Sequence, residues 1–257
     1  MQVSKYTLKG TRSSSESQIF VAIEGLLQQQ IKISLRGGDN NDFEPPHCWL
    51  KLQKNQINYR SAIALAFGGK YSYPPSTLAQ QLSTSLKQQL NVNFVQVKVT
   101  PPAWLDFRIT ETAIQQWLQE NLNAIAPQPF PRSISSQNSF SEYIRGRCSS
   151  ILNLGISESI ISETPHDWKI PSFPHQNWLT AADWQFLSQL MATIDDLERP
   201  SGKRKRGLSL PQSFDQFYRH CQIFNRQQPH FPEISQLRLY LIALTEAILR
   251  CMGKGLF

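Results

Sequence analysis

The sequence predicts an α+β protein made of a small N-terminal α+β domain followed by an all-α helical domain. Short segments that alternate apolar and polar residues, the pattern of half-buried strands, fall in the first half. After residue 140 the apolar residues recur at helical spacing instead. A proline- and serine-rich stretch lies between these parts. We therefore expect an N-terminal domain at 1–125, a linker at 126–139 and a helical domain at 140–257.

The first elements of the N-terminal domain are predicted as helix, two strands and helix. Residues 13–30 begin with serines and a glutamate and then place apolar residues on one helical face, so they predict a capped amphipathic helix. Residues 31–35 alternate and predict a short strand, and a second strand is expected at 48–52. Residues 59–67 are rich in small side chains and predict a helix.

The remainder of this domain predicts a helix, two strands and a closing helix. Prolines open the first of these helices at residue 74. Leucines four residues apart form its buried stripe: Leu78, Leu82, Leu86 and Leu90. Strands are expected at 95–99 and 104–109, and the closing helix at 110–122.

Four helices are predicted in the second half, at 140–154, 180–197, 213–224 and 235–253. The last has a core stripe of apolar residues, and Arg238 and Arg250 are expected to be more exposed than that stripe. The core stripe consists of Leu237, Leu241, Leu244 and Ile248.

Residues 163–177 contain three prolines and are expected to be irregular. Four aromatic residues in and beside this segment favour covering the core over stacking on bases. They are Trp168, Phe173, Trp178 and Trp184.

Charge favours a polyanionic partner. The 26 lysines and arginines exceed the 19 acidic residues, which gives a formal net charge of +7 and a pI near 9.3. The excess is shared by both halves, so it fits a folded surface that follows a phosphate backbone better than a detachable basic arm.

No apolar run approaches the roughly 20 residues of a membrane span, and the first ten residues lack a secretory signal pattern. We therefore expect a cytoplasmic protein with no membrane partner. The four cysteines are Cys48, Cys148, Cys221 and Cys251. Their wide spacing predicts reduced, mostly buried thiols and no metal site.

Catalytic patterns are weak throughout the chain. The five histidines have no nucleophile at a telling spacing, and Gly68–Lys70 lacks the rest of a phosphate-binding P-loop. Asp195 and Asp196 are expected to be a solvated helix end. We therefore expect no enzymatic activity and no cofactor.

The segment 140–154, FSEYIRGRCSSILNL, interleaves basic, aromatic and apolar residues at helical spacing. On a helix, Phe140, Tyr143, Arg147 and Ile151 lie near one another, whereas Arg145 points elsewhere. Periodicity alone favours a core helix with two solvated arginines.

A family resemblance changes that interpretation. The run 143–152, YIRGRCSSIL, resembles the helix that opens the DALR anticodon-binding domain of arginyl-tRNA synthetases. Residues 214–221, FDQFYRHC, and the run from Arg238 through Leu256 are similar to later helices of the same domain. The resemblance implies a DALR-type helical bundle over the whole C-terminal half.

The N-terminal half resembles a second module of that family, its N-terminal additional domain, which contacts the D-loop of tRNA. The similar runs are 59–65 (YRSAIAL), 73–79 (YPPSTLA) and 101–110 (PPAWLDFRIT). Two modules in the family's order make the resemblance more specific than either alone.

The family's catalytic domain would lie between these modules, where this chain has only the short linker. No HxGH run for ATP is present, and the basic run 201–207 lies inside the helical domain rather than where a KMSKS-like loop belongs. The resemblance therefore implies a protein derived from a synthetase without its catalytic core.

The resemblance and the charge together nominate residues for RNA contact. Tyr143, Arg145 and Arg147 belong to the anticodon-domain helix, and Phe217, Tyr218 and Arg219 to a later one. In the N-terminal module the candidates are Tyr59, Arg60 and Arg108. The densest basic cluster, Lys203, Arg204, Lys205 and Arg206, could clamp phosphates or form a solvated loop.

Several positions depart from the family pattern. Ile57–Asn58 replaces a glycine–aspartate pair, Ala62 replaces an asparagine, and Arg145 replaces a histidine. The family's terminal motifs are also absent before Phe257, which is expected to weaken anticodon specificity more than general RNA affinity.

Three functions stay open from the sequence. The first is a noncatalytic tRNA-binding protein that holds the elbow and the anticodon arm, with tRNA-Arg as the candidate RNA. The second is a scaffold whose former RNA surfaces bind a protein partner. The third is an accessory part of arginine aminoacylation with a catalytic subunit supplied in trans.

Overall fold

The computed structural model describes residues 21–35, 46, 48–53, 56–125, 139–163, 167–170, 179–197, 210–227 and 231–253. This part of the chain combines helices with one four-stranded antiparallel sheet, so the predicted α+β class is confirmed. It divides into two compact units, and the boundary between them falls within the helix at residues 111–125. The first unit covers 22–114, and the second covers Val21 and the residues from Gln115 onward.

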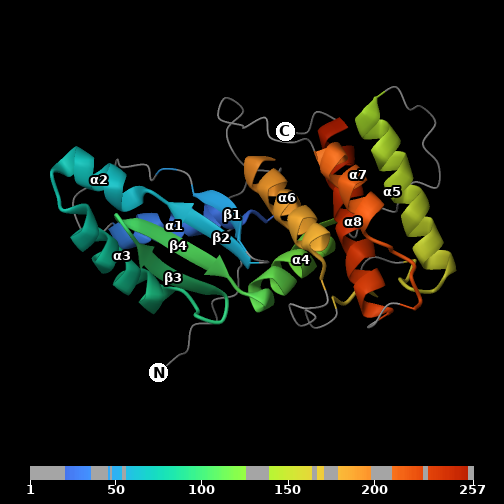
Figure 1. Cartoon of the computed structure of the whole chain (residues 1–257), viewed down its shortest axis with the longest axis horizontal. Coiled ribbons are helices and arrows are strands. Elements are labelled where there is room, and N and C mark those ends of the chain that lie inside the picture. The colour runs from blue at the N-terminus through green and yellow to red at the C-terminus, as the bar shows by residue number, and fades with distance from the viewer. Residues whose placement is uncertain are drawn as a thin grey trace. The chain divides into compact units, whose positions relative to one another are not determined.

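The first unit contains three helices and the sheet (Figure 1). Its helices are α1 (Ile23–Leu35), α2 (Ile63–Tyr71) and α3 (Pro75–Gln89). Its strands are β1 (Trp49–Gln53), β2 (Gln56–Ser61), β3 (Val95–Thr100) and β4 (Trp104–Ile109), in the order β1-β2-β4-β3. α4 (Glu111–Ile125) starts in this unit, and most of it belongs to the second.

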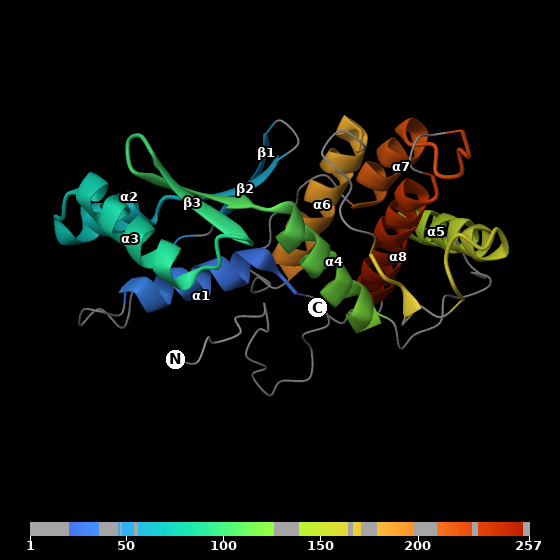
Figure 2. The same cartoon turned by 90° about the horizontal axis from the view of Figure 1, so that it is seen from below.

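The three helices of this unit cover one side of its sheet (Figure 2). Alternate residues of the strands supply the sheet's part of this core, and all are buried. They are Ile57, Tyr59, Ser61, Val95, Val97, Leu105, Phe107 and Ile109. The residues between them point to the other side, as expected for the two-residue period of a strand.

Three element predictions in this unit are wrong. The helix predicted at 13–30 begins only at Ile23, because residues 21 and 22 are not helical. Residues 31–35 end α1 instead of forming a strand, because Ile23, Leu27 and Ile31 continue one helical stripe while Ile33 is exposed. Residues 56–61 form a strand and α2 begins at Ile63, so the helix predicted from residue 59 starts too early. The predicted strands at 48–52, 95–99 and 104–109 are confirmed within two residues.

The second unit is helical. It contains most of α4 together with α5 (Phe140–Ser157), α6 (Ala181–Leu197), α7 (Leu210–His220) and α8 (Glu233–Gly253). Almost every residue of α8 between 234 and 249 is buried, so this helix forms the centre of the unit. α5 packs on α8, and α6 packs on α7 and α8. Gly155 allows the close approach of α5, since a Cβ there would lie 2.8 Å from Leu239.

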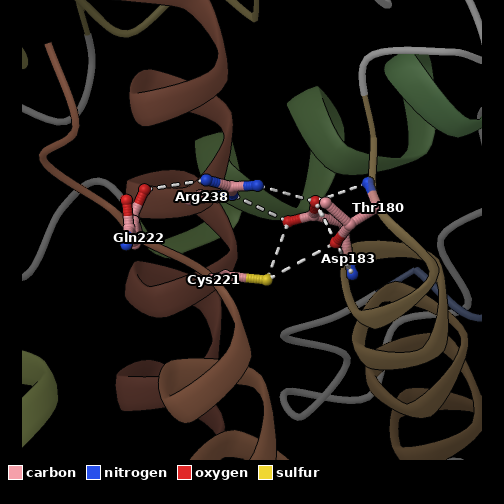
Figure 3. A network of polar contacts seen from close by, with 5 residues as sticks. All are labelled: Thr180, Asp183, Cys221, Gln222 and Arg238. Carbon is pink, nitrogen blue, oxygen red and sulfur yellow. Dashed lines mark hydrogen bonds and ion pairs between the residues drawn. The ribbon is translucent and has the colours of Figure 1, made fainter. Parts of the chain in front are cut away.

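A buried ion pair joins α8 to α6 and to the residues that follow α7 (Figure 3). Arg238 of α8 donates from Nε and Nη2 to the two carboxylate oxygens of Asp183, each at 2.9 Å. Thr180 caps α6 by donating its backbone N–H and its hydroxyl to Asp183, both at 2.8 Å. Arg238 also donates to the carbonyl of Gln222 at 2.8 Å, and the Cys221 thiol lies 3.5 Å from Asp183.

This pair corrects the expectation that Arg238 is more exposed than the apolar stripe of its helix, since it is only 2% exposed. Asp195 is likewise buried rather than part of a solvated helix end. Trp168 and Trp184 are buried as predicted, whereas Phe173 and Trp178 lie outside the described residues. None of the four cysteines forms a disulfide, and three of them are buried.

None of the described helices combines the length and apolar character needed to cross a membrane.

Candidate nucleic-acid interface

The first turns of α5 present aromatic side chains on the surface of the second unit. Ser139 and Glu142 form a capping box that fixes the start of this helix. Phe140 and Tyr143 are 45% and 42% exposed, and their rings stack with centroids 6.3 Å apart. The buried stripe of the helix is a different one, made of Ile144, Cys148, Ser149, Ile151, Leu152 and Gly155. The aromatic pair is therefore free of the core.

Arg147 connects this aromatic pair to α7. It lies one turn after Tyr143 and donates from Nη1 to the Tyr143 hydroxyl at 3.1 Å. Its guanidinium carbon is 4.2 Å from the centroid of the Tyr218 ring. Tyr218 in turn stacks on buried Phe214, with ring centroids 6.1 Å apart. We call Phe140, Tyr143, Arg147 and Tyr218 the α5–α7 surface.

The chemistry of this surface suits an anionic ligand with planar groups. A guanidinium carries five N–H donors, and Arg147 donates from Nη1 to the Tyr143 hydroxyl while its guanidinium carbon lies over the Tyr218 ring. Partial burial opposes its positive charge, but Tyr218 and Tyr143 outweigh that effect and raise the pKa of Arg147 above its ordinary value. A permanent cation thus lies beside exposed aromatic rings, the combination used to bind phosphates and unpaired bases.

The other candidates on these two helices are not part of the surface. Phe217 is 2% exposed and stacks on Phe186 with centroids 4.4 Å apart, so it belongs to the core and cannot contact an RNA. Arg219 extends into solvent and pairs with Asp215 at 2.8 Å. Arg145 is half-buried, and its Nε has no hydrogen-bond partner within the described part of the chain.

The candidates in the first unit separate in the same way. Tyr59 is fully buried under the sheet, which corrects its nomination as an RNA contact. Arg60 and Arg108 lie on the opposite side, at alternating positions from the buried residues. Arg60 binds Asp106 through two nitrogens at 2.6 and 2.8 Å.

The cluster Lys203, Arg204, Lys205 and Arg206 lies outside the described residues, as does most of the predicted linker. The described residues contain no group of three histidine, cysteine or acidic side chains placed to hold a metal ion.

The sequence did not predict some residues that the structure places next to the candidate RNA contacts. Phe140 lies on the predicted helical stripe but is not among the predicted RNA contacts, although its spacing of three from Tyr143 indicates a shared surface. Trp49, Lys51 and Lys98 also share a sheet face with Arg60 and Arg108. Only the strand register, which the sequence did not reveal, brings these residues together.

Comparisons of the chain with models of protein families, with curated proteins and with solved structures find no match.

Proposed function

We propose that this chain is a noncatalytic RNA-binding protein whose ligand is tRNA, bound at least in part through the α5–α7 surface. The observation that carries the proposal is the position of Arg147 between the Tyr143 hydroxyl and the Tyr218 ring, beside exposed Phe140. Loops of RNA are recognised through unpaired bases stacked on such rings and through phosphates bound by arginine.

The net charge of +7 supports the same ligand class, because attraction to phosphates supplies most of the sequence-independent affinity for RNA. The resemblance to the anticodon-binding helix of arginyl-tRNA synthetases makes tRNA the first RNA to test. On this proposal the chain derives from the two appended domains of such an enzyme, and its lack of the HxGH run accounts for a binding role without aminoacylation.

A titration of the protein with total tRNA and with a tRNA-Arg transcript tests this function. We expect micromolar or tighter binding at about 50 mM salt that weakens strongly at about 200 mM. The critical variant is Arg147→Ala combined with Tyr143→Ala, which should lose most of the affinity.

Arg226→Ala is the matched control. Arg226 is exposed and pairs with Glu158 at the opposite end of α5. Its partner lies eleven residues from Arg147, or about 16 Å along the helix axis, so its removal subtracts one charge from the same unit without touching the α5–α7 surface.

Three outcomes would refute the proposal. Absence of tRNA binding at low salt would favour the scaffold, with the exposed aromatic pair as its protein contact. Equal losses in the double variant and the control would show that charge alone drives binding. Arginine-dependent ATP–pyrophosphate exchange would instead reveal a catalytic activity.

A further inference from the structure

α1, α2 and α3 lie on one side of the sheet (Figure 2). The strand residues that face the opposite side are polar or aromatic. These residues alternate with buried ones along β2, β3 and β4, and with partly exposed ones along β1. A strand face that packed on another layer of the protein would be apolar, as the opposite face is. This composition therefore indicates a face that meets solvent or a polar ligand.

Strand register arranges these side chains in two rows across the sheet. The first row contains Trp49, Arg60, Asp106 and Lys98, which are partners in neighbouring strands. The second contains Lys51, Asn58, Arg108 and Gln96. With strands about 4.8 Å apart, each row spans about 14 Å. In the first row Lys98 lies on edge strand β3 and Arg60 on inner strand β2. In the second row Lys51 lies on edge strand β1 and Arg108 on inner strand β4.

Charge on this face is strongly positive. Its carboxylate, Asp106, is occupied by Arg60 and also accepts a hydrogen bond from Thr100 at 2.9 Å. Arg60 and Asp106 neutralise each other, so Lys51, Lys98 and Arg108 supply three positive charges in excess across the two rows. This excess excludes a cationic ligand and favours one with several phosphates.

Two indoles lie within the cationic field. Trp49 and Trp104 pack edge to face, with ring centroids 5.5 Å apart and planes at 62°. The guanidinium carbon of Arg60 is 5.6 Å from the Trp104 centroid, which holds that ring in place. Trp49 is 39% exposed on edge strand β1, so part of a large flat ring remains open to a ligand.

We propose that this sheet face binds a single-stranded segment of nucleic acid, with a base stacked on Trp49 and backbone phosphates bound by Lys51, Lys98 and Arg108. Stacking platforms within a positive surface bind unpaired strands of any sequence, because every base has a π face. A duplex keeps its bases stacked on each other, so Trp49 has no base face to bind there. This second surface does not depend on the α5–α7 surface.

The test uses the full chain and a 12-nucleotide oligo-U, beside a hairpin duplex with the same number of phosphates. Tryptophan fluorescence reports stacking, and anisotropy of a labelled oligonucleotide reports affinity. We expect oligo-U to bind and to quench tryptophan emission, and the duplex to bind without equal quenching. Trp49→Ala should remove most of the quenching and weaken binding about 5- to 150-fold.

A double variant, Lys51→Gln with Lys98→Gln, tests the phosphate contacts without altering the indoles. It should reduce the slope of log affinity against log salt by about 1.4, because each lost phosphate contact changes it by about 0.7 for a single strand. Lys87→Gln is the control, since Lys87 is exposed near the end of α3, on the helix-covered side of the sheet. It should leave that slope nearly unchanged.

Unchanged oligo-U affinity in Trp49→Ala and in the double lysine variant would overturn the proposal, provided that both fold as the wild type by circular dichroism. Equal displacement of oligo-U and equal quenching by poly-glutamate would assign the face to acidic peptides instead. Failure of the sheet-face proposal is distinguishable from failure of the proposed function. The proposed function is tested by the tRNA affinity of Tyr143→Ala and Arg147→Ala, and these substitutions leave the sheet face intact.

Discussion

Arg147 of α5 lies over the ring of Tyr218 of α7, with its guanidinium carbon 4.2 Å from the ring centroid. The same side chain donates to the hydroxyl of Tyr143 at 3.1 Å. Arg147 therefore holds two aromatic residues from helices that are about 70 positions apart in the chain. Arg147 therefore has two roles: it links α5 to α7, and it places a positive charge beside the aromatic rings.

Replacement by lysine separates these two roles. Arg147→Lys keeps the charge but removes the planar guanidinium, so tRNA affinity should fall while its salt dependence changes little. Arg147→Gln should lower both affinity and salt slope. A lysine variant that binds tRNA as tightly as the wild type would show that stacking and the forked donors are dispensable.

The ion pair between Asp183 and Arg238 should contribute strongly to folding. Removing one partner leaves the other charge buried, which costs about 3–5 kcal/mol. Asp183→Asn should therefore lower the free energy of unfolding by this order in urea titrations. Asp215→Asn breaks an i,i+4 pair with exposed Arg219 in the same unit and should cost less than about 1 kcal/mol. Similar losses in both variants would contradict this assignment.

The same pair predicts acid sensitivity. Burial opposes ionisation of Asp183, but the hydrogen bonds and charge of Arg238 outweigh it and lower the pKa of this carboxyl below its ordinary value. Its stabilising contribution is therefore complete above the ordinary carboxyl pKa of about 4, and it is lost as pH falls towards the lower folded-state value. The stability difference between wild type and Asp183→Asn should shrink from pH 6 to about pH 3. A constant difference would exclude ionised Asp183 as its source.

Thiol reactivity should differ among the cysteines. Burial, with Asp183 nearby, raises the pKa of Cys221 to about 11, and burial with Glu246 nearby raises that of Cys148. Cys48 is also buried, whereas Cys251 is partly exposed near the end of α8. Ellman's reagent at pH 8 should therefore modify Cys251 first, and Cys251→Ser should abolish the fast phase. A fast phase that persists in this variant would contradict the burial of the other three.

The sequence predicted elements best where one period extended over several turns or a whole strand. The leucines of α3 and the alternation in β3 and β4 each have one interpretation, and these elements are observed where expected. Residues 31–35 show the limit of short patterns. Their alternation fits a strand, but Ile31 also completes a helical stripe begun at Ile23, and the longer pattern decides the structure.

Long-range pairing explains the other differences. Arg238 resembles a solvated residue on an amphipathic helix, and its partner Asp183 lies 55 positions earlier, beyond any periodicity. The same holds for the α5–α7 surface, where Tyr143 and Arg147 were predictable as neighbours on one helix. That Tyr218 joins them while Phe217 enters the core follows only from how α7 packs.

The most direct test of the central claim is the affinity of tRNA for the wild type, for Tyr143→Ala with Arg147→Ala, and for Arg226→Ala, at about 50 and 200 mM salt. The account predicts salt-sensitive binding that the double variant loses and the control keeps. Binding that is absent from the wild type, or equal in all three proteins, would contradict it.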